Sequence, residues 1–258
     1  MRVTTINVNG VRAAESKGLA AWLAGHAADV VCFQEVRARE EQVPATLSGL
    51  PGYRPFWFCA ERGGYSGVGI LSRRQPDLVT CGMGLGEHDL EGRVIRADFG
   101  KLSVLSVYIP SGTSGEERLA YKLRFLDDFL RHLLELRDAG RELIVAGDYN
   151  IAHKPVDLKN WRSNQKNSGF LPEERAWLDR LEGSGFVDVH RRLVGPEAVV
   201  YSWWSNRGQA RQKDVGWRLD YQWATPAVAA LARSASVYRE GFFSDHAPVT
   251  VEYDPSIV

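Results

Sequence analysis

The sequence is poor in cysteine and carries no excess charge of either sign. Its three cysteines, Cys32, Cys59 and Cys81, are widely spaced, and no C-x-x-C pair occurs. An odd number without paired spacing argues against a disulfide framework and against a thiolate metal site. Lys and Arg together number 32, as do Asp and Glu, so the net charge is zero. Any surface that binds nucleic acid must therefore be local.

Long hydrophobic runs are also missing. No apolar segment approaches the roughly 18 residues that a membrane span requires, and the first residues, Met1–Thr5, lack the apolar stretch of a signal peptide. The chain shows no internal repeat, low-complexity linker or charged tail. We therefore expect a cytoplasmic protein with no membrane partner and no obligate protein partner, folded as a single domain over residues 1–258.

What the chain does contain is a succession of strand-like runs with helical patterns between some of them. Helices are predicted for Lys17–Ala28 with Ser16 as the cap, for Ser114–Ala139, and for Pro172–Leu181. Some strands follow one another directly, which indicates hairpins and mixed sheets. The predicted strands are Arg2–Val8, Asp29–Phe33, Gly67–Leu71, Val94–Phe99, Leu102–Ile109, Glu142–Ala146, Leu219–Ala224 and Ala247–Glu252.

Polar side chains follow the strand that leads into Gly147-Asp148-Tyr149-Asn150. Side chains two apart on a strand point to one face, so Asp148 and Asn150 are expected to project together, with Tyr149 turned away. A carboxylate beside a carboxamide can deprotonate a water molecule and hold a developing oxyanion. The sequence therefore predicts a hydrolytic site at this strand end.

Other predicted strands end in residues of similar capability, namely Asn7, Glu35, Tyr108, Asp220, and the pair Asp245-His246. Each has a plain structural alternative: a turn cap, a core aromatic or a buried hydrogen-bond acceptor. Together they supply carboxylates for a hard divalent cation, a base for water and an electrophilic histidine. The set therefore indicates a metal-assisted phosphodiesterase.

With these residues the chain resembles the exonuclease III family of apurinic/apyrimidinic endonucleases, within the endonuclease/exonuclease/phosphatase superfamily. The resemblance runs from end to end and is most specific in Gly169–Arg175 (GFLPEER) and Gly216–Tyr221 (GWRLDY). It implies a deoxyribonuclease I-like four-layer α/β sandwich, with two packed mixed β-sheets flanked by helices.

The resemblance also implies roles for individual residues. Asp148 would orient or deprotonate the attacking water, and Asp220 would position His246 against a phosphate oxygen. Which of Asp148 and His246 is the base, and whether one or two ions act, stays open. The implied cofactor is Mg²⁺, with Mn²⁺ as an alternative. The implied metal site consists of Asn7, Glu35, Asp148, Asn150 and Asp245. The implied catalytic residues are Tyr108, Asp148, Asn150, Asp220 and His246.

Substrate contacts are expected in the long aperiodic stretch from Ala152 to Gly169 and in the tryptophan-rich segment that follows it. Lys159, Arg162 and Lys166 give the aperiodic stretch a local basic surplus that suits phosphates. Apolar walls around a flipped abasic sugar are implied by the resemblance, and of the adjacent Trp203 and Trp204 only one can face such a pocket. The implied DNA-binding residues are Asn164, Asn167, Trp203, Trp217 and Leu219.

Two positions depart from the family pattern: Ser111 stands where many members carry Asn, and Asn9 where some carry Asp. We expect cleavage of double-stranded DNA 5′ to abasic sites, with exonuclease activity and cleaning of blocked 3′ ends. The alternatives are an exonuclease or 3′-phosphatase with weak abasic-site incision, a relative acting on phosphoinositides or sphingolipids, and a non-catalytic nucleic-acid-binding module.

Overall fold

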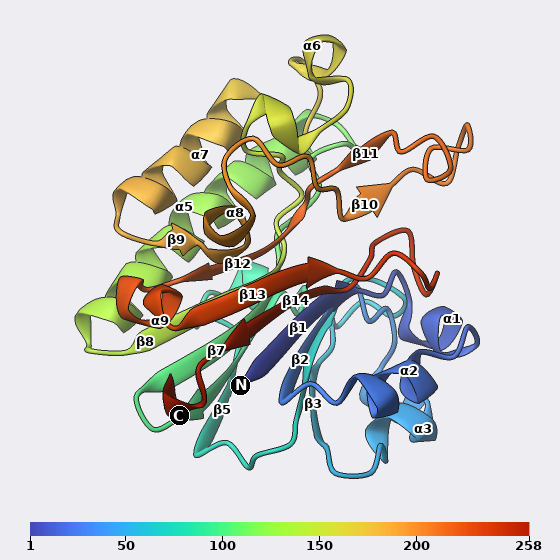
Figure 1. Ribbon diagram of the computed structural model, residues 1–258, viewed down its shortest axis with the longest axis vertical. Coiled ribbons are helices and arrows are strands. Elements are labelled where there is room, and N and C mark those ends of the chain that lie inside the picture. Colours follow the sequence, from blue (N-terminus) through green and yellow to red (C-terminus); the bar gives the residue numbers. More distant parts are fainter. Residues whose placement is uncertain (258) are drawn as a thin grey trace.

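The computed structural model describes residues 1–257 and contains two six-stranded sheets (Figure 1). The first sheet has the order β13 (Ala232–Val237), β14 (Val249–Tyr253), β1 (Arg2–Asn7), β2 (Val30–Gln34), β4 (Val68–Ser72) and β3 (Arg54–Phe58). The second has the order β5 (Leu78–Cys81), β6 (Val94–Phe99), β7 (Leu102–Tyr108), β8 (Glu142–Asp148), β12 (Asp220–Ala224) and β9 (Val187–Asp188). A separate two-stranded ribbon joins β10 (Trp203–Trp204) to β11 (Gly216–Trp217).

Each sheet is mixed, with one parallel pair near its centre. β1 pairs in parallel with β2, and β7 pairs in parallel with β8, whereas the neighbouring pairs are antiparallel. The carboxyl ends of parallel strands lie at the same edge of a sheet. The loops after β1 and β2, and those after β7 and β8, therefore leave each sheet side by side.

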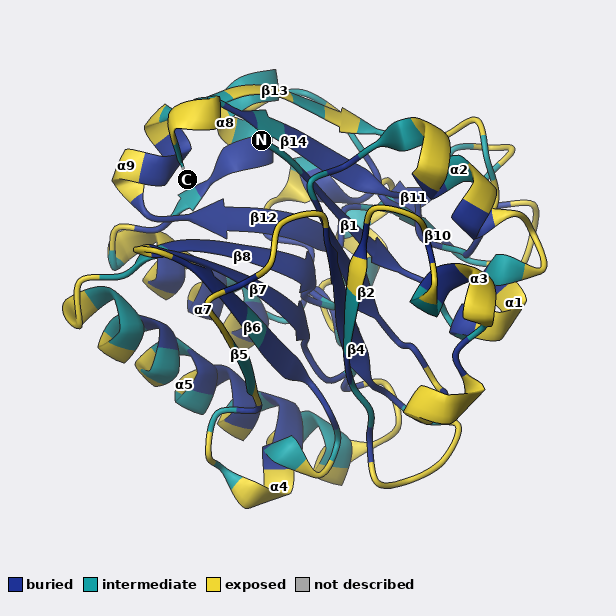
Figure 2. Ribbon diagram, turned by 90° about the horizontal axis from the view of Figure 1, so that it is seen from below, coloured by how far each residue is buried: buried dark blue, intermediate teal, exposed yellow. Residues whose placement is uncertain are grey.

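Helices cover the outer face of each sheet (Figure 2). One side carries α1 (Val11–Glu15), α2 (Leu19–His26) and α3 (Ala45–Ser48), and the other carries α5 (Glu116–Asp138) and α7 (Pro172–Gly183). Short helices in the connections are α4 (Gly86–Asp89), α6 (Trp161–Asn164), α8 (Val189–Val194), α9 (Pro226–Ala230), η1 (Glu40–Gln42), η2 (Pro155–Asp157) and η3 (Pro255–Ile257).

The buried apolar side chains form three large clusters that correspond to the layer boundaries. The cluster between the sheets includes Ile70 and Val104, one from each sheet. A second fills the space under α1–α3, and a third joins Phe129 of α5 and Trp177 of α7 to the second sheet. The predicted four-layer α/β sandwich is therefore confirmed.

All eight predicted strands are present, but short amphipathic edge strands such as β5 and β13 were missed, because their exposed residues break the apolar pattern. The predicted Ser16 cap is wrong. The helix begins only at Leu19, since Gly18 has a φ of 88°, and Ser16 instead ends α1. Within residues 1–257 no helix is long and apolar enough to cross a membrane.

Leu133→Ala and Leu78→Ala make the same chemical change in opposite environments. Leu133 lies on α5 in the core and is fully buried, so its truncation should cost about 2–5 kcal/mol of unfolding free energy. Leu78 is 53% exposed, and its truncation should cost less than about 0.5 kcal/mol. Urea denaturation measures both values, and equal losses would contradict the assigned layers.

Candidate active site

Polar side chains from both sheets converge at one edge of the sandwich. The convergence follows from topology, because the parallel pairs end there and the antiparallel strands β12 and β14 begin there. Asp220, for example, lies directly opposite Asp148 in the β8–β12 register. The residues brought together are Asn7, Glu35, Tyr108, Asp148, Asn150, Asp220, Asp245 and His246.

The turn after β8 is built by a close backbone approach and an unusual conformation. A β-carbon at position 147 would lie 1.9 Å from the carbonyl oxygen of Val107, so only Gly147 fits beside β7. Beyond Asp148 the strand ends, and Asn150 has a φ of 50°. Asp148 and Asn150 therefore do not share a strand face as predicted, although their side chains do meet. The Asn150 backbone N–H donates to Asp148 Oδ1 at 2.8 Å, and its Nδ2 to Oδ2 at 3.2 Å.

Asn7 links the two carboxylates across the sheets. Its Nδ2 donates to Glu35 Oε1 and to Asp148 Oδ2, both at 2.8 Å, while its Oδ1 accepts the backbone N–H of Asn9 at 2.9 Å. The amide oxygen is thus engaged, and the NH₂ group faces the site. This geometry gives Asn7 an orienting role, and its role as a metal ligand stays a prediction.

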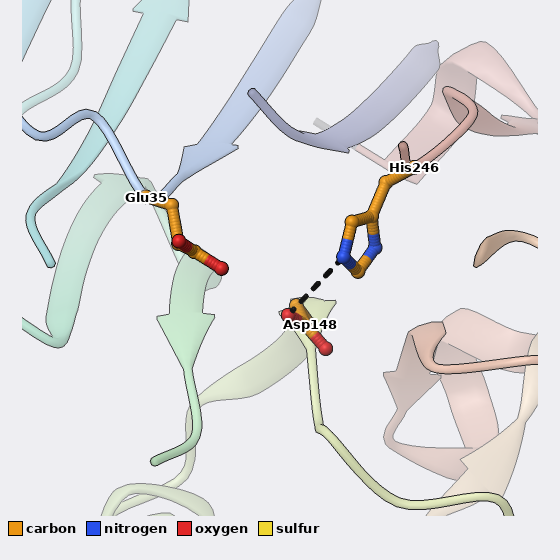
Figure 3. A group of neighbouring side chains, drawn as sticks. All are labelled: Glu35, Asp148 and His246. Atoms are coloured by element: carbon orange, nitrogen blue, oxygen red, sulfur yellow. Dashed lines mark ion pairs between the residues drawn. The ribbon is translucent and has the colours of Figure 1, made fainter. Parts of the chain in front are cut away.

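Glu35 and Asp148 can each offer a carboxylate oxygen to a metal ion, and His246 lies beside them, since one donor atom from each of the three residues lies within 4.8 Å of the others (Figure 3). All three are buried at the floor of the site, and His246 Nε2 lies 3.9 Å from Asp148 Oδ2. Two carboxylates beside an open cleft fit a hard divalent cation, which keeps room for water and for substrate oxygens. The donor set therefore fits the metal that the sequence implies.

His246 is held by a buried carboxylate. Its Nδ1 lies 2.9 Å from Asp220 Oδ2, whereas Asp220 Oδ1 has no hydrogen-bond partner within residues 1–257. Burial by itself lowers the pKa of His246, but the negative charges of Asp220 and Asp148 outweigh burial and raise that pKa to about 10. His246 is therefore an imidazolium at neutral pH, suited to donate a hydrogen bond rather than to accept a proton.

Two further acidic groups in the site have pKa values above their ordinary ones. Burial raises the pKa of Asp148 to about 7, with Asp220 and Glu35 adding to the increase and His246 opposing it. Burial also raises the pKa of Tyr108 well above its ordinary value, together with the charges of Glu35 and Asp148. Tyr108 therefore remains a phenol that can donate a hydrogen bond.

Asp245 is tied to the rim of the site rather than to its floor. Its Oδ2 accepts Trp203 Nε1 at 3.1 Å, and its Oδ1 accepts Asn9 Nδ2 at 2.9 Å and Ser244 Oγ at 3.0 Å. Asp at position 9 would set two carboxylates against each other, so Asn9 suits this rim. Asp245 lines the cleft beside His246, and its place at the metal stays a prediction.

A cleft of about 900 Å³ opens above these groups. Trp203 and Trp217 stand on one side with rings 6.3 Å apart and nearly perpendicular, whereas Trp204 faces inward and is buried. Asn164 and Asn167 stand together, with Asn167 Nδ2 donating to Asn164 Oδ1 at 2.8 Å. All five predicted DNA-binding residues line this cleft: Asn164, Asn167, Trp203, Trp217 and Leu219.

Arg37 and Arg93 belong to the site but were not predicted from the sequence. Arg37 forms an ion pair with Glu35, and both residues have a φ of 50°. Arg93 is buried, donates to the Tyr108 carbonyl oxygen at 2.9 Å and lies over the Tyr108 ring at 4.8 Å. A basic residue two positions after Glu35 was the only signal for Arg37, and no sequence pattern indicated Arg93.

Comparison with known proteins identifies the family. Residues 4–246 match the endonuclease/exonuclease/phosphatase family. The chain is 39% identical to the DNA repair nuclease APEX1 of Danio rerio, over 97% of this chain and 81% of that protein. It is 37% identical to an exodeoxyribonuclease of Bacillus subtilis, over 96% and 98%. The chain belongs to the endonuclease/exonuclease/phosphatase family.

Solved structures agree with the family assignment. An AP endonuclease from Archaeoglobus fulgidus superposes with a TM-score of 0.90 at 26% identity, covering 98% of this chain and 99% of that one. A 3′ phosphatase from Neisseria bound to a product DNA hairpin superposes with a TM-score of 0.88 at 28% identity, covering 98% and 99%. The predicted family, fold and enzyme type, a hydrolase related to exodeoxyribonucleases and AP endonucleases, are confirmed.

Metal binding at this site should depend on pH. Because burial raises the pKa of Asp148 to about 7, this carboxyl carries a proton below pH 7, and a cation must displace that proton. Affinity for Mn²⁺, measured by titration calorimetry, should therefore rise by about tenfold per pH unit below 7 and level off above it. Equal affinities at pH 5.5 and 8 would contradict this prediction.

Proposed function

We propose that the protein is a Mg²⁺-dependent DNA repair phosphodiesterase that cleaves the backbone 5′ to abasic sites and leaves a 3′-hydroxyl. The observation that carries the proposal is the meeting of Glu35, Asp148 and His246 at the floor of a cleft walled by tryptophans. We also propose 3′–5′ exonuclease and 3′-end-cleaning activity. The family match over residues 4–246 supports a single catalytic domain.

The residues of the chain divide the work of hydrolysis between them. Asp148 takes the proton of the attacking water, which Asn150 holds, because the carboxamide is fixed against both Asp148 and the Ile109 carbonyl oxygen. His246 donates a hydrogen bond to a non-bridging phosphate oxygen, and Asp220 fixes its ring. Tyr108 donates to the phosphate or to the leaving oxygen. The charge that builds up on the phosphate is thus met by fixed donors.

Mg²⁺, or Mn²⁺ in its place, supplies the positive charge that neutralises the phosphate in the transition state. Glu35 would be the principal anionic ligand, with Asp148 beside it. The other proposed contributors are Asn7, Asn150 and Asp245, of which Asn7 orients both carboxylates through its NH₂ group. Arg37 balances the charge of Glu35 before the ion binds.

The cleft walls explain how an abasic site would be selected. Trp203, Trp217 and Leu219 offer apolar surface to a deoxyribose without its base, and a narrow pocket excludes one that keeps it. Asn164, Asn167 and the exposed Lys166 suit the flanking phosphates. The DNA named with the Neisseria structure supports a DNA substrate for this fold.

Cleavage of a duplex with one abasic site tests this function directly. Wild-type protein with Mg²⁺ should cut 5′ to the site, EDTA should abolish cutting, and Asp148→Asn should lower kcat by at least about 10³-fold because water activation is lost. Asp138→Asn, the same change at an exposed position on α5, should leave kcat unchanged. Cutting that resists EDTA, or full activity of Asp148→Asn, would contradict the proposal.

The pocket assignment is tested by comparing two substrates. Trp217→Ala should lower kcat/KM for abasic-site incision by about tenfold or more, and affect removal of a 3′-phosphate much less, since only incision needs the flipped sugar enclosed. Trp22→Ala, on α2 in the outer helical layer, should change neither. Equal losses on both substrates after Trp217→Ala would count against the pocket.

A second candidate function is exonuclease or 3′-phosphatase activity that exceeds abasic-site incision. Ser111 lines the cleft, and its hydroxyl lies 3.0 Å from that of Thr113. A serine side chain is shorter than that of the Asn that the family resemblance implies at this position. An exonuclease or 3′-phosphatase with weak abasic-site incision is the activity that Ser111 favours.

A further inference from the structure

Lys122 is a fully buried cation directly behind the turn that carries Asn150. It lies on α5, and its Nζ donates to Glu174 Oε1 at 2.6 Å and to the Asn150 carbonyl oxygen at 2.8 Å. Burial lowers the pKa of Lys122, and the carboxylate of Glu174 opposes this decrease. Lys122 therefore holds the backbone of a proposed catalytic residue from the side opposite the cleft.

Glu174, in the first turn of α7, ties the adjacent substrate loop to the same point. Its Oε2 accepts the backbone N–H of Gly169 at 2.6 Å and of Leu171 at 3.0 Å, and its Oε1 accepts Ser168 Oγ at 2.9 Å. With Lys122 the carboxylate accepts four hydrogen bonds: one from an ammonium group, one from a hydroxyl and two from backbone N–H groups. One side chain thus fixes the segment 168–171, which directly follows the proposed phosphate contact Asn167.

The loop, the catalytic turn and the pocket wall touch at Gly169. This residue has a φ of 98°, and a β-carbon there would lie 3.2 Å from the Trp217 ring and 3.4 Å from the Asn150 carbonyl oxygen. Its own carbonyl oxygen accepts the Ala152 backbone N–H at 2.8 Å. A shift of this loop would therefore push against both Asn150 and Trp217.

Stability alone does not account for an ion pair at this place. A buried ion pair is costly to desolvate, and apolar side chains of similar size are often as good for stability. The neighbouring contacts between α5 and α7 are already apolar, as with Phe129 and Trp177. Unlike an apolar contact, a hydrogen-bonded ion pair fixes the direction of its partners. Asn150 has a φ of 50°, and such a strained backbone must be held by its neighbours.

We propose that Lys122 and Glu174 form a positioning pair that fixes the Asn150 turn and the 168–171 substrate loop in one geometry, so that DNA seated on the loop meets a correctly placed catalytic amide. The inference rests on the proposed function. Neither Lys122 nor Glu174 lines the cleft, so both act through the residues that they hold.

Kinetics of two variants test this pair over a range of abasic DNA concentrations up to saturation, well below the melting temperature of each protein. Lys122→Met removes the bond to Asn150 and should lower kcat by about 10–100-fold, since small misplacements at a reacting centre carry costs of that size. Glu174→Gln removes an acceptor for the loop and should lower kcat and raise KM, each by about tenfold. Leu133→Ala is the control for lost stability: it lies on α5, about 16 Å along the helix from Lys122, and should keep kcat within threefold.

Trypsin provides a readout that does not need activity. Lys166 is exposed just before the loop, and Glu174→Gln should speed cleavage after Lys166 at least fivefold relative to wild type and Leu133→Ala. The proposal is overturned if Glu174→Gln keeps kcat within threefold, if Leu133→Ala loses as much, or if trypsin cuts all three equally. If Lys122→Met does not fold, Glu174→Gln decides alone. If wild-type protein fails to cut DNA, the proposed function is refuted. The trypsin result still shows whether Glu174 holds the 168–171 loop.

Discussion

The hydrogen bonds of Asn7 to Glu35 and Asp148 are the interaction on which the site depends. Asn7 ends a strand of one sheet and Glu35 follows the next strand of that sheet, whereas Asp148 ends a strand of the other, so this amide joins the two sheets at their shared edge. If the sheets slid past each other by one residue, the carboxylates would separate and no cation could contact both. The core between the sheets therefore serves the site as much as it serves stability.

The carboxylates of the site repel one another, and neighbouring cationic groups offset this repulsion. Arg37 pairs with Glu35, Arg93 stacks on Tyr108, and His246 lies between Asp220 and Asp148. The proposed divalent cation would complete this balance. The same balance keeps His246 cationic and leaves Asp148 as the group able to accept a proton.

Backbone strain is concentrated in the same region. Asn9, Glu35, Arg37 and Asn150 all have φ between 44° and 50°, a conformation that residues other than glycine seldom adopt. Such residues need support from their neighbours, which the Asn9 bonds to Asn7 and Asp245 supply on one side of the cleft. Lys122 and Glu174 supply it on the other. The polar residues around the cleft thus hold the strained turns in place through hydrogen bonds.

The sequence by itself indicated mixed sheets and the chemical types at the site, because strand patterns and short motifs such as Gly147–Asn150 are local, and its resemblance to a known family implied the four-layer fold. It predicted that Asp148 and Asn150 would meet, but for the wrong reason, since the strand ends at Asp148 and a left-handed turn brings Asn150 back. Only the tertiary structure decided which way the Asn7 amide faces, that Arg93 packs on the Tyr108 ring, and that Lys122 reaches Asn150. These contacts join residues in or beside different secondary-structure elements, and no local pattern encodes them.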